Sequence, residues 1–281
     1  MIEEKNNFNI LFAGGDMRQI YAARCLEKSD FEVFFFALGE KNCAKEKYYD
    51  IIVLPAPCTR DGETLFAPLC EKKIFIENLA EFAPPKAVIA GGCGSIENKI
   101  FSGCETKFFD ILKDDEYNTL NAAASAEGAI CCAIKAADFN LLGSEILITG
   151  FGKIGKVLSS DLRGLGARVS VAARKASDLA LAEALGFEPT EYSALSDFAD
   201  KFKIIFNTVP KTVIDEDIIK NLNKSCIIID LASKPGGVDF SAAEKHNIKT
   251  LWELGLPGRY SPKTSGEIIA KIIKKITDGI I

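Results

Sequence analysis

The sequence contains one histidine, His246, and its nine cysteines include no C-x-x-C pair. Zinc sites are built mostly from paired cysteines and histidines, so we expect no metal site. His246 stands in AAEKHNI, where a helix end favours a cationic or hydrogen-bonding side chain, and we expect it to be structural. A catalytic cysteine would lack a convincing partner, so we expect reduced packing thiols. The cysteines are Cys25, Cys43, Cys58, Cys70, Cys93, Cys104, Cys131, Cys132 and Cys226.

The chain also lacks a basic block, a long uncharged apolar run and a signal-like beginning. Its 34 Lys and Arg and 39 Asp and Glu residues are interspersed, with a net charge of −5 and a pI near 5.2, which leaves no electrostatic footprint for nucleic acid. No window approaches the roughly 18 apolar residues of a membrane span. The start MIEEKNNFNILFAGG has no basic segment followed by an apolar one. We therefore expect a cytoplasmic protein with neither nucleic-acid nor membrane partners.

No low-complexity stretch or short repeat interrupts the 281 residues. This length suggests about two domains. Apolar runs alternate with helical stretches, which indicates α/β architecture with parallel, doubly wound sheets. We predict a substrate domain at 1–120, a connecting helix at 121–140 and a second sheet domain at 141–260.

The first sheet is predicted from short apolar runs, each bounded by Pro, Gly or charge. These runs are FNILFAGG, FEVFFFAL, YYDIIVLPAP, KKIFIENL and KAVIAGG.

Two further segments are predicted to be helices. From about residue 119, NAAASAEGAICCAIKAADF is rich in alanine and free of proline, which indicates one long connecting helix. The last segment, 261–281, has apolar residues at helical spacing, with Ser261 or Thr264 as a plausible cap. Because the second sheet already looks complete, we expect this helix to cross back onto the first domain. Its apolar stripe is Ile268, Ile269, Ile272, Ile273 and Ile276.

The strongest local motif is a G-x-G-x-x-G made of Gly150, Gly152 and Gly155, which includes Lys153 and Ile154. It follows the strand-like EILIT, opens a helix and leads after about 20 residues into RVSVAAR, as a dinucleotide fingerprint does. The first two glycines would admit the pyrophosphate, and the helix N-terminus would offer N–H groups to it. A simple tight strand-to-helix turn is the alternative. The motif predicts that 141–260 is a Rossmann NAD(P)-binding domain.

The residues after RVSVA indicate which dinucleotide binds. An NAD site usually has an Asp or Glu there for the ribose 2′-hydroxyl, whereas this chain has Arg174 and Lys175, followed by Ser177. Arg174 can hold a 2′-phosphate by charge-assisted hydrogen bonds, with Lys175 or Ser177 assisting. We therefore predict NADP as the cofactor. The alternative is a solvated helix start, which Lys175 would fit equally well.

Polar residues follow two more strands of this domain. Asn207 to Pro210 ends KIIFNTVP, and Asp230 opens the tail of IIIDLASKPGGVD. Because ligands lie outside the carboxyl ends of parallel strands, we expect Asn207, Pro210 and Asp230 near the nicotinamide half of the cofactor. Asn207 could instead be a turn former ahead of Pro210.

Several stretches resemble the dipicolinate synthase A-subunit family. They are AAASAEGAI, GFGKIG, NTVP, DLASKPGGVDFSAAEKHNI and LPGRYSPKTSGEIIA, with AGGDMRQ and LPAPCTRDGETL in the first half. More distantly, the two-domain plan is similar to formate/glycerate and adenosylhomocysteinase-type dehydrogenases, whose helix start resembles Ser125 to Gly128.

The resemblance implies a dehydrogenase that oxidises a dihydropyridine dicarboxylate to pyridine-2,6-dicarboxylate with NADP as hydride acceptor. It also implies that the partner is a flavoprotein-like B subunit, and that the location is the mother cell of a spore former. A homo-oligomer is left open.

A dicarboxylate substrate needs cations and N–H donors. Candidates are the helix-start turn with Arg18, the Thr59 loop, and two lysines near strand or helix ends. Arg18 could instead pair with Asp16, and each cation could simply be solvated. The substrate-binding candidates are Gly14, Gly15, Arg18, Thr59, Lys234 and Lys263.

The chemistry mainly needs orientation and a base. Lys234 and Glu127 are the candidate catalytic residues, with a helix carboxylate as the alternative for Glu127. A shikimate-type or methylene-tetrahydrofolate-type NADP dehydrogenase, and a non-catalytic NADP-binding subunit, are alternative functions.

Overall fold

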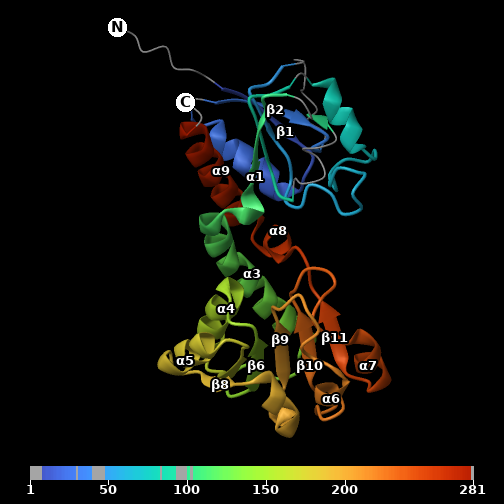
Figure 1. Ribbon diagram of the computed structural model, residues 1–281, viewed down its shortest axis with the longest axis vertical. Coiled ribbons are helices and arrows are strands. Elements are labelled where there is room, and N and C mark those ends of the chain that lie inside the picture. Colours follow the sequence, from blue (N-terminus) through green and yellow to red (C-terminus); the bar gives the residue numbers. More distant parts are fainter. Residues whose placement is uncertain are drawn as a thin grey trace. The chain divides into compact units, whose positions relative to one another are not determined.

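The computed structural model describes residues 8–29, 31–39, 48–82, 84–92, 100–101 and 104–279. The chain divides into two compact units, and each is an α/β unit with one parallel sheet. The first unit comprises Met1–Asn121 with Ser261–Ile281, and the second comprises Ala122–Tyr260. Figure 1 shows both units, with labels on many of their helices and strands.

The sheet of the first unit has the order β2-β1-β3-β4-β5, and all its paired strands are parallel. The order reverses direction between β1 and β3, which is the pattern of a flavodoxin-like doubly wound sheet. Its strands are β1 (Phe8–Ala13), β2 (Phe31–Phe36), β3 (Ile51–Val53), β4 (Ala87–Ala90) and β5 (Lys107–Asp110). The helical segments within the described residues of this unit include α1 (Met17–Leu26), the 3₁₀ turns Ile76–Glu81 and Ile111–Lys113, the start of α3 (Asp115–Ala136), and α9 (Pro262–Asp278).

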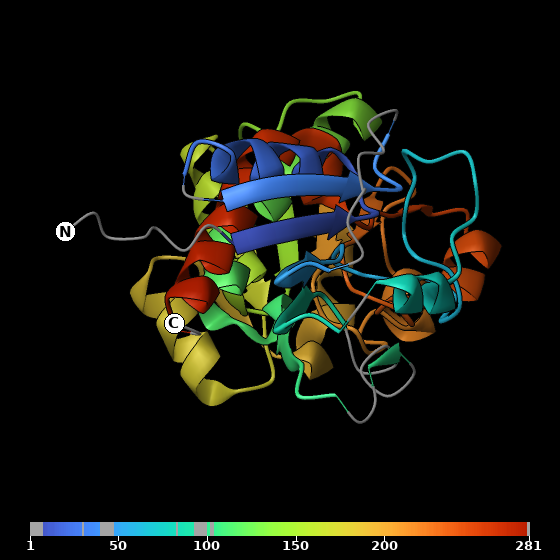
Figure 2. The ribbon, with the colours of Figure 1, turned by 90° about the horizontal axis from the view of Figure 1, so that it is seen from above.

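The C-terminal helix α9 belongs to the first unit and packs on α1, which confirms the predicted return of this helix. Figures 1 and 2 show the dark red α9 beside the blue α1. Gly266 permits the close approach, because a Cβ there would lie 2.6 Å from the carbonyl oxygen of Arg18. The isoleucines of α9 from Ile268 to Ile273 are buried in the core of this unit, so burial of apolar area stabilises the docked helix.

Two segments differ from the expectation. KKIFIENL holds no sheet strand: residues Ile76–Glu81 form a 3₁₀ turn that buries Ile76 and Leu79. A short apolar run does not distinguish a strand from a buried turn, and here the spacing of three places both side chains on one face. The connecting helix starts earlier than 121, at Asp115, so Glu127 lies in the middle of α3 and not at its start.

The sheet of the second unit has the order β11-β10-β9-β6-β7-β8 and is parallel throughout. Read from β8 in chain order this is 3-2-1-4-5-6, the Rossmann arrangement, with its switch point between β6 and β9. The strands are β6 (Glu145–Thr149), β7 (Arg168–Ala172), β8 (Glu188–Thr190), β9 (Ile204–Asn207), β10 (Ile227–Asp230) and β11 (Lys249–Trp252). The helices besides α3 are α4 (Lys153–Gly164), α5 (Ala176–Ala184), α6 (Glu216–Ile219), α7 (Phe240–Lys245) and α8 (Leu256–Tyr260), with 3₁₀ turns at Tyr192–Asp197 and Ala199–Lys201.

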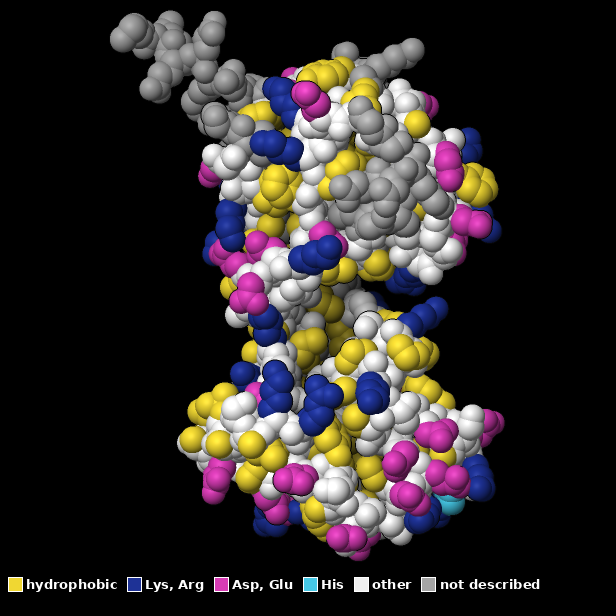
Figure 3. All heavy atoms as spheres, viewed as in Figure 1, with side chains coloured by type: hydrophobic (Ala, Val, Ile, Leu, Met, Phe, Trp, Pro, Cys, Tyr) yellow, Lys and Arg dark blue, Asp and Glu magenta, His cyan; other side chains and the backbone are white. Residues whose placement is uncertain are grey.

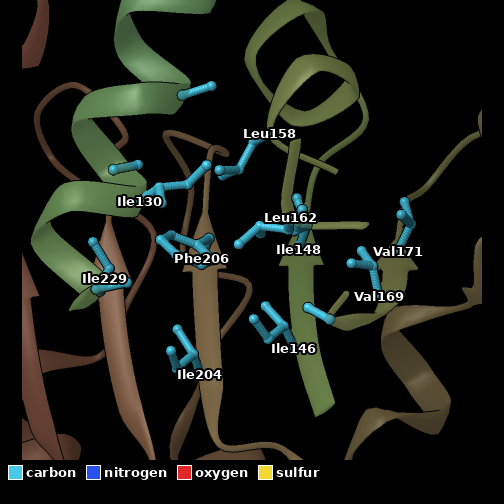
Figure 4. Close-up of a cluster of buried hydrophobic side chains, with 14 of the residues drawn as sticks. Ile130, Ile146, Ile148, Leu158, Leu162, Val169, Val171, Ile204, Phe206 and Ile229 are labelled. Carbon is cyan, nitrogen blue, oxygen red and sulfur yellow. The ribbon is translucent and has the colours of Figure 1, made fainter. Parts of the chain in front are cut away.

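Alternate residues of these strands face two separate apolar layers. Ile146 and Ile148 of β6 face α3 and α4, and Figure 4 shows Ile130 and Leu158 pointing toward them over the sheet. Leu147, between them in sequence, belongs to the opposite core, with the apolar residues of α6 and α7. Because both faces are covered, the strands are continuous apolar runs, as the sequence shows.

The described cysteines are free, and Cys43 and Cys93 lie outside the described residues. Burial raises the pKa of Cys58 to about 11 and that of Cys226 to about 12, so both are protonated packing thiols near neutral pH. The ring of His246, at the end of α7, has Nε2 3.2 Å from Glu216 Oε1. Among the described residues no helix is long and apolar enough to cross a membrane, and no group of three or more metal-ligating side chains occurs.

Candidate dinucleotide site and the strand ends

The turn between β6 and α4 depends on two glycines that approach other protein atoms. Gly150 has φ +92°, in the left-handed region, and a Cβ there would lie 2.8 Å from Val209 Cγ2. A Cβ at Gly155 would overlap the carbonyl oxygen of Gly150, so Gly155 lets α4 pack closely on the strand. These glycines hold the turn against the sheet.

Gly152 differs from both, because a Cβ there would meet no heavy atom within 4 Å. It is the N-cap of α4, and no side chain caps this helix, whereas Asp16 caps α1 and Asp239 caps α7. The first turn of α4, with Lys153 and Ile154, contains no acidic residue. An uncapped helix N-terminus beside open space, free of negative charge, fits a dinucleotide pyrophosphate.

Gly152→Ala is expected to separate binding from stability. Gly152 has φ −78°, which alanine adopts easily, so the free energy of unfolding should change by no more than about 1 kcal/mol. The methyl group would occupy the space beside the helix N-terminus and weaken dinucleotide binding about tenfold or more. Calorimetric titration and thermal unfolding measure the two effects. Gly164→Ala is the matched control, since a Cβ at this other end of α4 also meets open space; equal binding by both variants would contradict the site.

The end of β7 carries two cations in place of an acid. Arg174 and Lys175 are exposed and line a pocket of about 670 Å³ together with Gly150 and Phe151 of the glycine turn. This volume lies within the range of about 300–1,000 Å³ typical of small-molecule sites. Ser177 is exposed on the first turn of α5 and does not line this pocket.

Tyr192 also lines the pocket and was not foreseen from the sequence. Burial raises its pKa to about 12, against the opposing effects of a Gly150 backbone hydrogen bond and the charge of Arg174. The hydroxyl therefore stays protonated at neutral pH. Tyr192 opens the short 3₁₀ turn Tyr192–Asp197 after the edge strand β8, and no periodicity marks it in the sequence.

Asn207, Asp230 and Thr149 form a buried hydrogen-bond network at the ends of β9, β10 and β6. Asn207 Nδ2 donates to Asp230 Oδ1 at 2.7 Å, and Thr149 Oγ1 donates to Asn207 Oδ1 at 2.6 Å. All three side chains are fully buried. Such a network satisfies every member and fixes neighbouring backbone.

Asp230 also organises the chain that follows it. Its carboxylate accepts the N–H groups of Ala232 at 3.0 Å and Gly237 at 2.8 Å. Asn207 likewise bonds the backbone of Val209, through Nδ2 at 3.0 Å and Oδ1 at 3.1 Å. The side chains of Asn207 and Asp230, predicted to bind cofactor, are thus engaged within the protein, and what they do is position the two loops.

The loop held by Asp230 presents Ser233 and Lys234 to solvent. Gly237 is required there because a Cβ would overlap Asn207 Nδ2 and the Val209 carbonyl oxygen. Pro210, on the other loop, lines the pocket. The two strand-end loops therefore lie against each other at Gly237 and Val209.

In the first unit, the expectation that Gly14 and Gly15 expose N–H groups is corrected. The Gly14 N–H donates to the Phe36 carbonyl at 2.8 Å, and the Gly15 N–H donates to the Phe66 carbonyl at 2.7 Å. A Cβ at Gly14 would lie 2.7 Å from Leu65 Cδ2. The segment that contains Leu65 and Phe66 covers the turn, a long-range contact that local sequence does not reveal.

Arg18 takes the alternative role, as the partner of Asp16. Its Nε and Nη2 donate to the two carboxylate oxygens of Asp16 at 2.9 Å each, and Nη2 also donates to the Ala56 carbonyl at 3.0 Å. Burial by itself would lower the pKa of Arg18, but the hydrogen bond and charge of Asp16, together with Tyr117, outweigh it and the pKa is raised. The guanidinium is buried and neutralised, so direct binding of substrate by Arg18 is not supported.

Thr59 serves its own loop. Its hydroxyl accepts the Gly62 N–H at 2.9 Å and donates to Asp61 Oδ1 at 3.1 Å. Asp61 accepts several hydrogen bonds, and these hold the pKa of its carboxyl well below the usual range; the bonds from Thr64 have the largest effect. Lys263 is exposed in the first turn of α9.

Glu127 is exposed on α3. The pKa of Asp161 is raised first by the burial of Asp161 and second by the negative charge of Glu127. Asp161 lies eight residues into α4, about 12 Å along the helix from its first residue. Glu127 therefore acts electrostatically on the body of α4, and no described hydrogen bond or ion pair joins it to the glycine turn, which does not support it as the base.

Comparison with known proteins assigns both units. Residues 9–112 match the N-terminal domain of the dipicolinate synthase A subunit, and residues 122–252 match the NAD binding domain of S-adenosyl-L-homocysteine hydrolase. The second unit is thus an NAD-type dinucleotide-binding domain.

Full-length relatives extend over both units. The A subunit of dipicolinate synthase from Bacillus subtilis is 29% identical over 283 residues, 95% of each chain. The crystal structure of its Bacillus halodurans counterpart is 28% identical, with a TM-score of 0.86 over 96% of this chain and 97% of that one. Escherichia coli D-lactate dehydrogenase, at 14% identity and a TM-score of 0.61 over 96% of each chain, shares the fold alone. The N-terminal domain match, the end-to-end sequence similarity and the superposition agree that this chain is similar over its whole length to the A subunits of dipicolinate synthase.

Proposed function

We propose that the protein is an NADP-dependent dehydrogenase that oxidises dihydrodipicolinate to dipicolinate. The assignment of NADP rests on the pocket that the glycine turn lines together with Arg174 and Lys175, with no carboxylate at the end of β7. A ribose 2′-hydroxyl is usually held by an acid at that position, whereas a 2′-phosphate needs cations. Figure 3 shows Lys and Arg side chains gathered over the carboxyl ends of the strands of the second unit.

The reaction transfers a hydride from the dihydropyridine ring to NADP and releases one proton, so that dipicolinate, NADPH and H⁺ are formed. The cofactor supplies the hydride acceptor, and the protein supplies binding, orientation and electrostatics. Lys234 is the residue proposed to meet a substrate carboxylate, because it is exposed on the loop that Asp230 holds beside the switch point. The released proton passes to solvent, so the role proposed for Lys234 is to bind and orient the substrate.

The direct test is NADP reduction with freshly made dihydrodipicolinate, followed at the absorbance of NADPH. We further propose that the partner is a flavoprotein-like B subunit, in the mother-cell cytoplasm of a spore former, so the assay is run with and without it. Turnover in either arm supports the function. A lack of turnover in both, with NADP bound, would favour a non-catalytic role, and turnover only with shikimate or methylene-tetrahydrofolate substrates would assign another dehydrogenase.

Lys234→Ala is expected to abolish turnover while NADP binding stays within a few-fold of the unmodified protein. The loop geometry rests on Asp230, so removal of an exposed side chain should leave the fold intact. Initial rates and cofactor titration measure the two effects. Lys245→Ala, which removes an exposed lysine of α7 paired with Glu216, is the control. Unchanged turnover in Lys234→Ala would remove this lysine from the site.

A further inference from the structure

The pocket at the glycine turn has a second wall, made by the loop after β9. Val209, Pro210 and Val213 supply apolar surface, and Lys211 lies between them in sequence on the same wall. Strand β9 flanks β6 on one side and β7 flanks it on the other. Cations from both flanking strands therefore border one pocket, on either side of the glycine turn.

Ion pairs neutralise only some of the exposed cations of this unit, such as Lys220 with Asp217 at 2.6 Å and Arg168 with Glu145 at 3.1 Å. Within the described part of the chain, no ion pair involves any of the three pocket cations. These are Arg174, Lys175 and Lys211.

Two carboxylates also border the pocket, and neither pairs with these cations. Asp215 caps α6, where its Oδ1 accepts the Ile218 N–H at 3.2 Å. Asp178 lies in the first turn of α5, where the helix dipole favours a negative charge. The three cations thus leave an excess of positive charge along an apolar-walled pocket.

We propose that Lys211 is a specificity-determining residue that binds the 2′-phosphate of NADP from the side opposite Arg174, with the adenine against the apolar wall. This inference rests on the proposed function and extends it to a residue outside the fingerprint. A phosphate monoester near pH 7 carries nearly two charges and three acceptor oxygens, more than one arginine satisfies. A lysine from a separate loop supplies a second charge without a rigid fork geometry.

The test is titration of the full-length protein with NADP⁺ and, separately, NAD⁺. Lys211→Met removes the charge but keeps the apolar stem, and it should weaken NADP⁺ about tenfold, or about 1.4 kcal/mol, while NAD⁺ binding stays within about twofold. The loss should shrink as salt is raised, because exposed charges are screened. Lys220→Met is the matched control, since it removes an exposed lysine nine residues away that does not line the pocket.

The outcomes separate this inference from the proposed function. Selective loss of NADP⁺ in Lys211→Met, with Lys220→Met unchanged, supports Lys211. A second variant, Arg174→Asp, should lose affinity for NADP⁺ and not for NAD⁺. If it does so while Lys211→Met binds NADP⁺ as tightly as the unmodified protein, the role of Lys211 is overturned and NADP remains the cofactor. If the unmodified protein does not prefer NADP⁺ over NAD⁺, the cofactor proposal fails, and Lys211 fails with it.

Discussion

Arg174→Asp is expected to weaken NADP binding about 100-fold or more, equivalent to about 2.7 kcal/mol, while NAD binding is retained or improved. The substitution removes the guanidinium and places a carboxylate against the 2′-phosphate, and juxtaposed like charges cost several kcal/mol. The same carboxylate can accept a hydrogen bond from the 2′-hydroxyl of NAD. Calorimetric titration with both cofactors at low salt measures the change in preference.

Arg168→Asp is the matched control for this substitution. Arg168 is the first residue of β7 and Arg174 follows its last residue, so the control makes the same charge change at the opposite, amino-terminal end of the strand. Arg168 is exposed and pairs with Glu145, and exposed pairs contribute at most about 1 kcal/mol. Equal losses of NADP and NAD in Arg174→Asp would contradict the 2′-phosphate assignment.

Asp230→Ala is expected to lower the free energy of unfolding of the second unit by about 3–5 kcal/mol. Asp230 is fully buried, and its oxygens accept hydrogen bonds from Asn207, Ala232 and Gly237. Alanine would leave three buried donors without these acceptors. Urea unfolding measures the loss. Trp252, the one tryptophan of the chain, reports it by fluorescence, because its Nε1 donates to the Ala232 carbonyl at 2.9 Å in the same loop.

Asp230→Asn tests whether the acceptor pattern matters in addition to shape. All three partners are donors, and the NH₂ group of asparagine, which is of equal size, would face at least one of them without an acceptor. We expect the free energy of unfolding to fall by about 2 kcal/mol. Asp217→Asn is the control, because Asp217 is an exposed carboxylate of α6. If Asp230→Asn were as stable as the control, the network would not be what holds the strand-end loops.

Local sequence predicted the elements whose pattern repeats over several residues. The apolar stripe of α9 and the glycine spacing of Gly150, Gly152 and Gly155 are of this kind, and both gave the correct element and the correct unit. KKIFIENL was too short for such a pattern. Its 3₁₀ turn is fixed by burial of Ile76 and Leu79 in the tertiary structure.

Site residues followed a different rule, because their roles depend on partners far away in sequence. The Arg18 guanidinium donates its hydrogen bonds to Asp16 and to the carbonyl of Ala56, 38 residues away. Gly14 and Gly15 donate to carbonyls of Phe36 and Phe66. Conversely, Lys211 becomes a candidate only because the loops after β7 and β9 border one pocket.

The sequence by itself determined the two α/β units, the dinucleotide turn and the absence of an acid after β7, since each depends on residues close together in the chain. Tertiary structure alone decided which polar groups are free to meet a ligand. Asn207 and Asp230 are bound to each other across two strands, whereas Arg174 and Lys211 border a pocket without carboxylate partners among the described residues. Strand order and loop packing bring these groups together, and neither is written in the spacing of nearby residues.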